Sequence, residues 1–261
     1  MGHLRLGRLP KTRKWNQVVT LLDSAPGDVS GIARAVVESA DSYLMGLNTD
    51  PSLGYCFWLL TRVTGAARES DFTLRLQELG IHTRHDASVL TFISQLADVA
   101  QSRIAHNVQS GPIGELASLA MRGALTETIG EHNLSLFSSS VTDLQRACVA
   151  YSTRKQFGIL AKDFFGDFFS RILRYFVAKE LSNYVGFQHG LNGVEASNEF
   201  NQSLDLYARQ SALIIEDFAA GWYSKHNWES KGEVSIKEAQ GFVAVALRKF
   251  RMELKRELDS Q

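Results

Sequence analysis

The sequence predicts an all-α protein, a multi-helix bundle around one long helix rich in aromatic residues. Leucine and alanine recur three and four residues apart through most of the chain, which is the spacing of one face of an α-helix. Clear alternation of apolar and polar residues over the length of a strand is missing. The chain has 261 residues, of which 44% are hydrophobic, and only four prolines. Such a chain is long and apolar enough to fold as one large or two small globular domains.

The apolar periodicity delimits the individual helices. We predict helices over residues 15–22, 28–47, 51–68, 71–79, 87–108, 112–129, 141–151, 154–185, 198–223 and 236–258. The residues at their ends agree with this assignment. Prolines suit a first helical turn and glycine suits a C-terminal stop, whereas serine, threonine and aspartate suit N-caps. The corresponding residues are Pro51 and Pro112 at starts, Gly80 at a stop, and Ser70, Asp86 and Ser140 at N-caps.

Two further starts carry the capping-box pattern, in which side chain and backbone satisfy each other's unpaired amides. Thr153 with Gln156 opens the helix predicted at 154, and Ser235 with Glu238 opens the one predicted at 236. Both helices therefore have well-defined beginnings.

The segment 154–185 is the most unusual of these helices, because apolar residues cover much of its circumference. A helix with so wide an apolar face must be covered by neighbours on several sides. At about 1.5 Å per residue it would be roughly 50 Å long, so we predict that it is the central rod of the bundle. Its apolar positions are Phe157, Leu160, Phe164, Phe165, Phe168, Phe169, Ile172, Leu173, Phe176, Val177 and Leu181.

A membrane-surface helix is the alternative for this segment. Such a helix has a mainly basic polar face, whereas this one mixes both signs at Lys162, Asp163, Asp167, Arg171 and Arg174. The core interpretation is therefore favoured. Gly158 and Gly166 each cost about 1 kcal/mol relative to alanine inside a helix, which predicts a close helix crossing or a kink at one of them.

The Ser-rich segment 131–140 is a candidate joint between two lobes. We predict an N-terminal helical lobe, residues 1–135, that carries a basic arm, and a C-terminal helical lobe, residues 136–261. One continuous domain is the alternative. A second weak joint, rich in glycine and asparagine, lies at 186–196.

Charge and cysteine content restrict the functional classes. Lysine plus arginine equals aspartate plus glutamate, so the whole molecule has no long-range attraction to nucleic acid or to an anionic membrane. Cys56 and Cys148 lie within apolar helical patterns, which predicts buried thiols in a reducing compartment. No signal peptide and no membrane span are visible. We therefore expect a cytoplasmic protein.

The stretch GWYSKHNWESKGEVSIKE, residues 221–238, places aromatic and basic residues between two predicted helices. Trp222 continues the apolar stripe of the preceding helix, whereas the residues after it fall in a loop of about ten residues, longer than most helix connections. Such residues either pack the loop onto the bundle or contact a partner. The candidate partner-binding residues are Tyr223, Lys225, His226 and Trp228.

Enzyme signatures are missing from the sequence. There is no Gly-rich phosphate loop, no GxSxG elbow and no HExxH motif. His82 and His85 have the spacing of a minimal metal pair but lack a second cluster. Arg103 and His106 are closer together than the Arg-x4-6-His pattern of many helical ribonucleases. The sequence therefore assigns no catalytic residue and predicts no metal and no cofactor, although a site assembled from distant residues stays open.

The two ends of the chain are basic. The first fourteen residues hold Arg5, Arg8, Lys11, Arg13 and Lys14 and no acid, and the last predicted helix holds Arg248, Lys249, Arg251, Lys255 and Arg256. Solvated termini explain both runs. The alternative is nucleic-acid binding through the N-terminal arm, because short basic arms also bind phosphate backbones.

Three segments together resemble a known group of sequences. They are GRLPKTRKWNQVVTLL near the start, ELSNYVG after the long helix, and FAAGWYSKHNW followed by GFVAVALRKFRMELKRE near the end. These segments resemble an uncharacterised group of bacterial all-helical proteins, some of whose genes are associated with phage-defence operons. The resemblance supplies a context, with no catalytic motif and no residue roles.

These observations lead to three functional hypotheses. The first is a non-enzymatic helical interaction protein, a sensor or accessory subunit of a bacterial anti-phage system, whose protein partner is encoded by a neighbouring gene. The second is a nucleic-acid-associated helical protein that uses its basic termini, which the balanced net charge disfavours. The third is a helical enzyme such as a nuclease, which the missing motifs disfavour.

Overall fold

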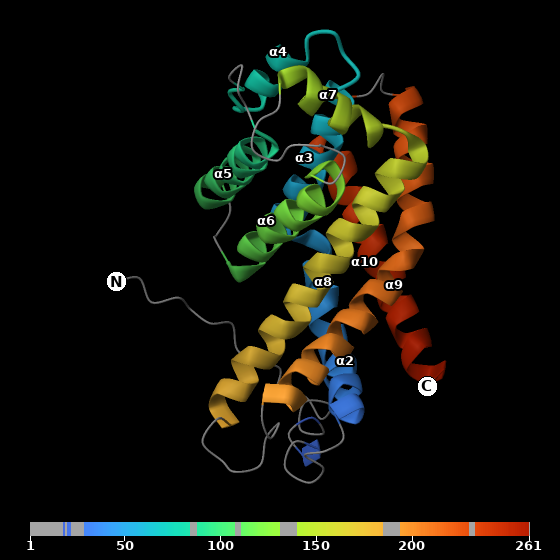
Figure 1. Cartoon of the computed structure of the whole chain (residues 1–261). Helices are drawn as coiled ribbons and strands as arrows, with labels where there is room; N and C mark the ends of the chain where they lie inside the picture. The colour runs from blue at the N-terminus through green and yellow to red at the C-terminus, as the bar shows by residue number, and fades with distance from the viewer. Residues whose placement is uncertain are drawn as a thin grey trace.

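The computed structural model of the protein describes residues 18, 20–21, 29–83, 88–107, 111–130, 140–184, 194–229 and 233–260. The all-α prediction is confirmed, since every element in these ranges is helical (Figure 1). The elements in chain order are α2 (Val29–Gly46), the 3-10 helix η1 (Leu47–Thr49), α3 (Pro51–Ala66), α4 (Phe72–Glu78), α5 (Val89–Asn107), α6 (Pro112–Leu125), the π-helix η2 (Thr126–Gly130), α7 (Val141–Ala150), α8 (Arg154–Tyr184), α9 (Val194–Glu229) and α10 (Ile236–Ser260).

Helix α8 is the central rod of the bundle, as its apolar circumference predicts. It runs beside α9 along much of its length, α6 packs on it, and α2 also contacts it (Figure 1). Its apolar residues from Phe157 to Phe176 have at most 4% of their surface exposed, apart from Ile159, which is half-buried. The core interpretation of this helix is therefore confirmed. Among the described helices, none combines the length and the apolarity needed to cross a membrane.

An aromatic cluster fills the space between α8 and its neighbours. Phe57 of α3 is its centre, with its ring stacked on Phe242 of α10 at a centroid distance of 4.5 Å. Phe157 and Phe165 of α8 and Trp222 of α9 surround the same ring at 5.6 to 5.9 Å. Aromatic pairs contribute about 0.5 to 1.5 kcal/mol beyond the area that they bury. The cluster therefore connects α3, α8, α9 and α10 through side chains alone.

Gly158 marks a close crossing of α8 and α9. A Cβ atom at this position would lie 2.5 Å from the backbone carbonyl oxygen of Glu216 and 3.1 Å from the Cβ of Ala220. At Gly166 the nearest atom is the Cβ of Ala212 at 3.6 Å, an ordinary contact distance. The predicted close crossing is thus confirmed at Gly158.

The helix starts agree with the sequence in most places. Ser140 and Asp143 form a capping box on α7, and Ser235 and Glu238 form the one predicted on α10. The prediction of Ser70 as an N-cap is wrong, because α4 begins at Phe72 with Asp71 before it. Asp50 caps α3 by accepting from the amides of residues 52 and 53. Asp86 lies outside the described residues.

Helix α6 ends in a way that the periodicity does not show. Its predicted last turn is the π-helix η2, and the buried hydroxyl of Thr128 donates to the carbonyl of Ala124 at 2.6 Å. The hydroxyl of Thr126 donates to the carbonyl of Arg122 in the same way. Such side-chain bonds compete with the backbone ladder and accompany bends in helices.

The two halves of the chain share one hydrophobic core. Helix α3 packs against α10, and the indole Nε1 of Trp58 donates to the carbonyl of Val234 at 2.8 Å. The side-chain amide of Gln240 donates to the carbonyl of Asp50 at 3.0 Å. The predicted lobe boundary near residue 135 lies outside the described residues, and helices from both sides of it contribute to this core. Both cysteines are buried and unpaired, as predicted.

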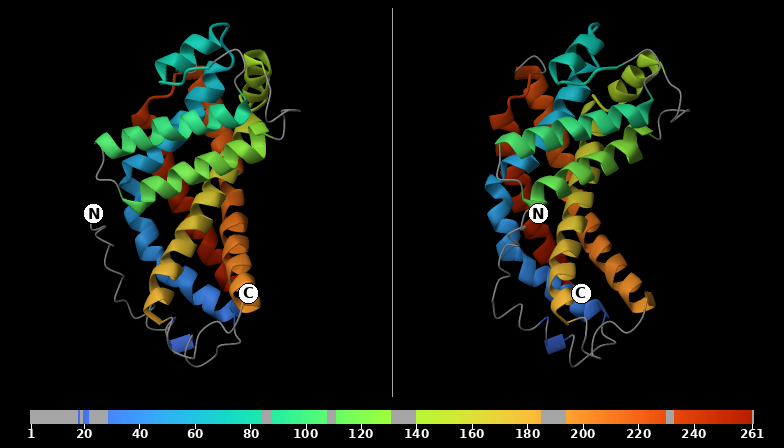
Figure 2. Two further views of the ribbon diagram at one scale, coloured as in Figure 1. Left: turned by 60° about the vertical axis from the view of Figure 1, so that its left-hand side comes forward. Right: turned by 90° about the vertical axis from the view of Figure 1, so that its left-hand side faces the viewer.

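Helices α5 and α6 form a layer that crosses over the long helices. Figure 2 shows the pair lying side by side and steeply inclined to α8. Helix α5 also contacts α3, and the backbone amide of His82, which follows α4, donates to the side chain of Gln95 on α5. One side of α5 thus faces α3 and the segment that follows α4.

Candidate functional site

The stretch that the sequence places in a loop is mostly helical. Helix α9 continues to Glu229, six residues beyond its predicted end at Tyr223, and α10 begins at Ile236. Gly221 does not end the helix, and a Cβ there would meet no atom within 4 Å. The predicted loop of about ten residues is therefore wrong, and the candidate partner-binding residues lie in the last turns of α9.

Tyr223 belongs to the core, whereas we predicted it as a contact residue. It is 1% exposed, and its ring stacks on Phe157 with centroids 3.8 Å apart and planes 10° apart. Its hydroxyl is 3.1 Å from the hydroxyl of Thr64. A side chain so enclosed holds α9 against α3 and α8, and it cannot reach a partner on the surface.

Lys225 and His226 lie closer to the surface. Lys225 is exposed, and His226 is half-buried with its Nδ1 2.9 Å from the carbonyl of Trp222. The other ring nitrogen of His226 is 4.0 Å from a carboxylate oxygen of Glu238. Bonds to Ser235, together with the charge of His226, lower the pKa of Glu238. His226 therefore helps to join α9 to the first turn of α10.

The remaining predicted site residues lie outside what the structure describes. Trp228 falls within α9, but its side chain is not among the described ones. Arg5, Arg8, Lys11, Arg13 and Lys14 of the basic arm, and His85 of the minimal metal pair, are also outside the described residues. Their predicted roles stay predictions.

Several cations of the last helix are engaged within the molecule. Arg251 and Lys255 pair with Asp41 of α2 at 2.7 and 3.1 Å. Lys249 lies over the ring of Phe218, 5.2 Å from its centroid. The basic run of α10 is therefore partly used to attach α10 to α2 and α9.

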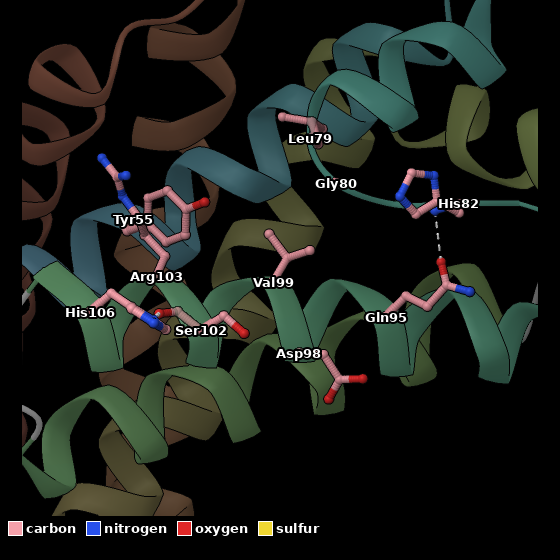
Figure 3. Close-up of a pocket in the computed structure, with 10 residues that line it drawn as sticks. All are labelled: Tyr55, Leu79, Gly80, His82, Gln95, Asp98, Val99, Ser102, Arg103 and His106. Atoms are coloured by element: carbon pink, nitrogen blue, oxygen red, sulfur yellow. Dashed lines mark hydrogen bonds between the residues drawn. The ribbon is translucent and has the colours of Figure 1, made fainter.

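An open groove of about 660 Å³ lies between α5, α3 and the end of α4 (Figure 3). Helix α5 contributes one wall, α3 contributes Tyr55, and the end of α4 with its linker contributes the opposite rim. Gly80 turns the chain at this rim with φ of +83°, a conformation that side chains rarely adopt. The lining residues are Tyr55, Leu79, Gly80, His82, Gln95, Asp98, Val99, Ser102, Arg103 and His106.

One end of the groove carries a guanidinium group that rests on a stack of aromatic rings. Arg103 lies over the ring of Tyr55, with its Cζ 5.9 Å from the centroid. The ring of Tyr55 stacks on that of Trp58 with centroids 5.3 Å apart. The indole N–H of Trp58 in turn donates a hydrogen bond to the carbonyl of Val234. Burial raises the pKa of Tyr55 although the charge of Arg103 lowers it, so the phenol is protonated at neutral pH. A cation–π contact of this kind helps to hold a guanidinium in place.

His106 lies beside this end of the groove. Its Nδ1 is 2.7 Å from the carbonyl of Ser102, one turn earlier in α5. A carbonyl oxygen can only accept, so Nδ1 carries a proton and Nε2 is the nitrogen left for a ligand. Arg103 and His106 are three residues apart, which places both side chains on one face of α5.

The other end of the groove is polar. The backbone amide of His82 donates to the side-chain oxygen of Gln95 at 3.0 Å, which fixes the linker against α5. Val99 of α5 lies between the two ends, and Leu79 lies across from it at the end of α4 (Figure 3). Asp98 lies on the flank of α5, with its carboxylate directed away from Tyr55 (Figure 3).

The arrangement places the guanidinium of Arg103 at one end, the apolar side chains of Val99 and Leu79 in the middle and hydrogen-bonding groups at the other end. Within the part of the chain described here, no group of three or more His, Cys, Asp or Glu residues has the geometry to hold a metal ion. Comparisons of the chain with protein-family models, with curated proteins and with solved structures found no match.

Proposed function

We propose that this protein is a non-enzymatic helical interaction protein of the bacterial cytoplasm, and that the groove along α5 is where it contacts its partner. The resemblance to proteins of phage-defence operons supports a role as a sensor or accessory subunit of an anti-phage system. We propose that the partner is encoded by a neighbouring gene.

The stacked guanidinium of Arg103 is the observation that carries the proposal. Arginine and aromatic residues supply much of the binding energy at protein interfaces. An arginine already held by Tyr55 loses less side-chain freedom on binding than a mobile one, so more of its interaction energy contributes to affinity. A wide groove also suits a segment of another protein better than a small substrate, which a site normally encloses.

The same groove fits acid–base catalysis less well. Catalytic sites exclude water and combine burial with charged neighbours to shift pKa values. Here Arg103 and His106 are both exposed, and the Nδ1 of His106 is bound to a carbonyl of its own helix. We therefore place binding before catalysis at this site.

The test is co-purification with the products of the neighbouring genes. We expect the wild-type chain to form a complex that Arg103→Glu abolishes, because a reversed charge repels the group that the guanidinium attracts. Arg248→Glu is the matched control, since Arg248 is also exposed but lies on α10 away from the groove. Melting curves of both variants check that the fold is intact.

Two results would oppose this proposal. A complex that tolerates Arg103→Glu but is lost with Lys225→Glu would move the contact site to the end of α9. Cleavage of RNA or DNA by the purified protein, abolished by His106→Ala, would replace an interaction protein with an enzyme.

A further inference from the structure

We infer that the exposed face of α9 binds the same face of a second copy of this chain, so that two α9 helices pair antiparallel about a two-fold axis at Leu213. This surface shares no residue with the groove along α5, so the inference is independent of the proposed function. In the right-hand view of Figure 2, the first half of α9 lies at the edge of the molecule, where a second chain can reach it.

Two leucines of α9 point away from the core. Leu206 is 55% exposed and Leu213 is 59% exposed, and Ile214 beside Leu213 is exposed as well. The two leucines are seven residues apart, which is the spacing of the seam between paired helices. Single apolar residues on a surface need no explanation, whereas a row of them on one helix face indicates an interaction surface.

Gly221 continues this face about two turns beyond Leu213. Glycine is unfavourable inside a helix compared with alanine. Packing against the described residues does not require it, because a Cβ at this position would meet none of their atoms within 4 Å. A residue without a side chain does allow the backbone of another chain or a large side chain to approach closely.

An antiparallel pair centred on Leu213 places these features opposite one another. A two-fold interface uses the same patch on both subunits, so a residue before the axis faces the residue equally far beyond it. Leu213 then packs on its own copy. Leu206, seven positions earlier, faces Ala220 and Gly221 of the second copy, where two small residues leave room for its side chain.

The charges on either side of Leu213 fit the same order. Arg209 lies one turn before Leu213 and Asp217 one turn after it, in a row of the kind that packs between helices. An antiparallel pair sets Arg209 of each copy against Asp217 of the other, whereas a parallel pair would set like charges together. Arg209 also lies 3.8 Å from Glu127, an exposed contact that is too long for a hydrogen bond. The apolar contacts therefore carry the association, and the charges fix the relative direction of the helices.

Analytical ultracentrifugation of the full-length purified protein over a series of concentrations tests this pairing. We expect a monomer–dimer equilibrium in the micromolar range, because only about four turns of each α9 take part and small interfaces belong to transient complexes. Leu213→Arg should raise the dissociation constant at least about tenfold, since it places two like charges on the axis. Leu74→Arg is the matched control, because Leu74 is exposed to a similar extent but lies on α4. It should leave the dissociation constant unchanged.

Gly221→Ala separates association from folding. Alanine is the better helix former, so the variant should melt at a higher temperature than the wild type at submicromolar concentration, where both are monomers. Its dimer should nevertheless be several-fold weaker, because the new Cβ meets Leu206 of the second copy. A general loss of folding would lower the melting temperature as well.

Cysteine cross-linking tests the register. Leu213→Cys should form a disulfide-linked dimer under mild oxidation, because residue 213 meets its own copy on the axis. Leu206→Cys should be linked only when it is mixed with Gly221→Cys. The native Cys56 and Cys148 are buried and do not compete.

Three outcomes overturn the inference. They are a monomer at every concentration, a dimer that tolerates Leu213→Arg, and a disulfide between two copies of Leu206→Cys, which would mean a parallel pair. A different protein that binds this face while the chain alone stays monomeric falls under the first of these. The proposed function fails separately, if the complex with the neighbouring gene products tolerates Arg103→Glu.

Discussion

Gly158 and Glu216 meet where α8 crosses α9, and a Cβ at Gly158 would lie 2.5 Å from the carbonyl oxygen of Glu216. The atom in the way belongs to the backbone, so no rotation of a side chain can relieve the contact. These two helices, the longest in the described part of the chain, are therefore packed at a distance that only glycine permits at this position.

Gly158→Ala should destabilise the protein by about 1 to 3 kcal/mol, as overpacking of a tight contact does. Gly166→Ala is the matched control, because its nearest neighbour is at 3.6 Å. There the gain in helix propensity, about 1 kcal/mol, should dominate and leave stability unchanged or raised. Urea denaturation of both variants measures the difference, and equal effects would contradict the close crossing.

Phe168→Ala should cost about 3 to 5 kcal/mol of unfolding free energy, a typical loss for a large buried aromatic. Its side chain is fully buried in the middle of α8. Leu206→Ala, at a residue 55% exposed on α9, should change stability by no more than about 0.5 kcal/mol. A thermal midpoint that does not respond to Phe168→Ala would refute the placement of α8 at the centre of the core.

Asp163 should make the fold less stable as pH rises. Burial raises its pKa above the ordinary 3.8, against the opposing charge of Lys162. The stabilising contribution of the protonated carboxyl is fully present below pH 3.8, and it is lost as the pH rises through the higher pKa of Asp163 in the folded protein. Asp163→Asn should therefore be at least as stable as the wild type at pH 7, with the difference shrinking in acid. Denaturation curves at several pH values measure this, and a destabilised variant at pH 7 would contradict it.

Asp41 should have the opposite effect. Burial acts to raise its pKa, but hydrogen bonds and charges of Arg251 and Lys255 outweigh it and lower the pKa below 3.8. The stabilising contribution of the ionised carboxylate is present above pH 3.8, and it is lost as the pH falls through the lower pKa of Asp41 in the folded protein. Asp41→Asn should be less stable than the wild type at pH 7, with a smaller difference in acid and in high salt. If Asp41→Asn is destabilised equally at neutral and acid pH, the loss comes from packing and the ion pairs do not explain it.

Cys56 and Cys148 should be unreactive in the folded protein. Both side chains are fully buried, and burial raises the pKa of both thiols. The thiolate is the reactive form, so modification by a thiol reagent should follow the rate of unfolding. Rapid labelling of either residue without denaturant would mean that its helix opens locally.

Most helix boundaries could be predicted because their signals are local. Apolar spacing and capping residues act within one or two turns, as the starts at Ser140 and Ser235 show. The end of α9 could not be predicted, since Gly221 and the polar residues after it have the composition of a loop. Tyr223 at the predicted end packs against Phe157 and Thr64, and within the extension His226 lies 4.0 Å from Glu238 of α10, contacts that local sequence does not indicate.

The groove could not be predicted for a related reason. Tyr55, Gly80 and Arg103 come from separate elements, and only the fold brings them together. The one local signal was the three-residue spacing of Arg103 and His106, which puts two functional side chains on one helix face. That spacing does not by itself indicate which other element faces them.

The bond between Trp58 and Val234 also sets the order in which the protein can fold during synthesis. Its two residues are separated by 176 positions, which a ribosome adding about 5 to 20 residues per second covers in roughly 10 to 35 s. During that interval the face of α3 that later packs on α10 has no partner. The nascent chain must therefore wait, with this apolar surface open to chaperones, until its last helix has been made.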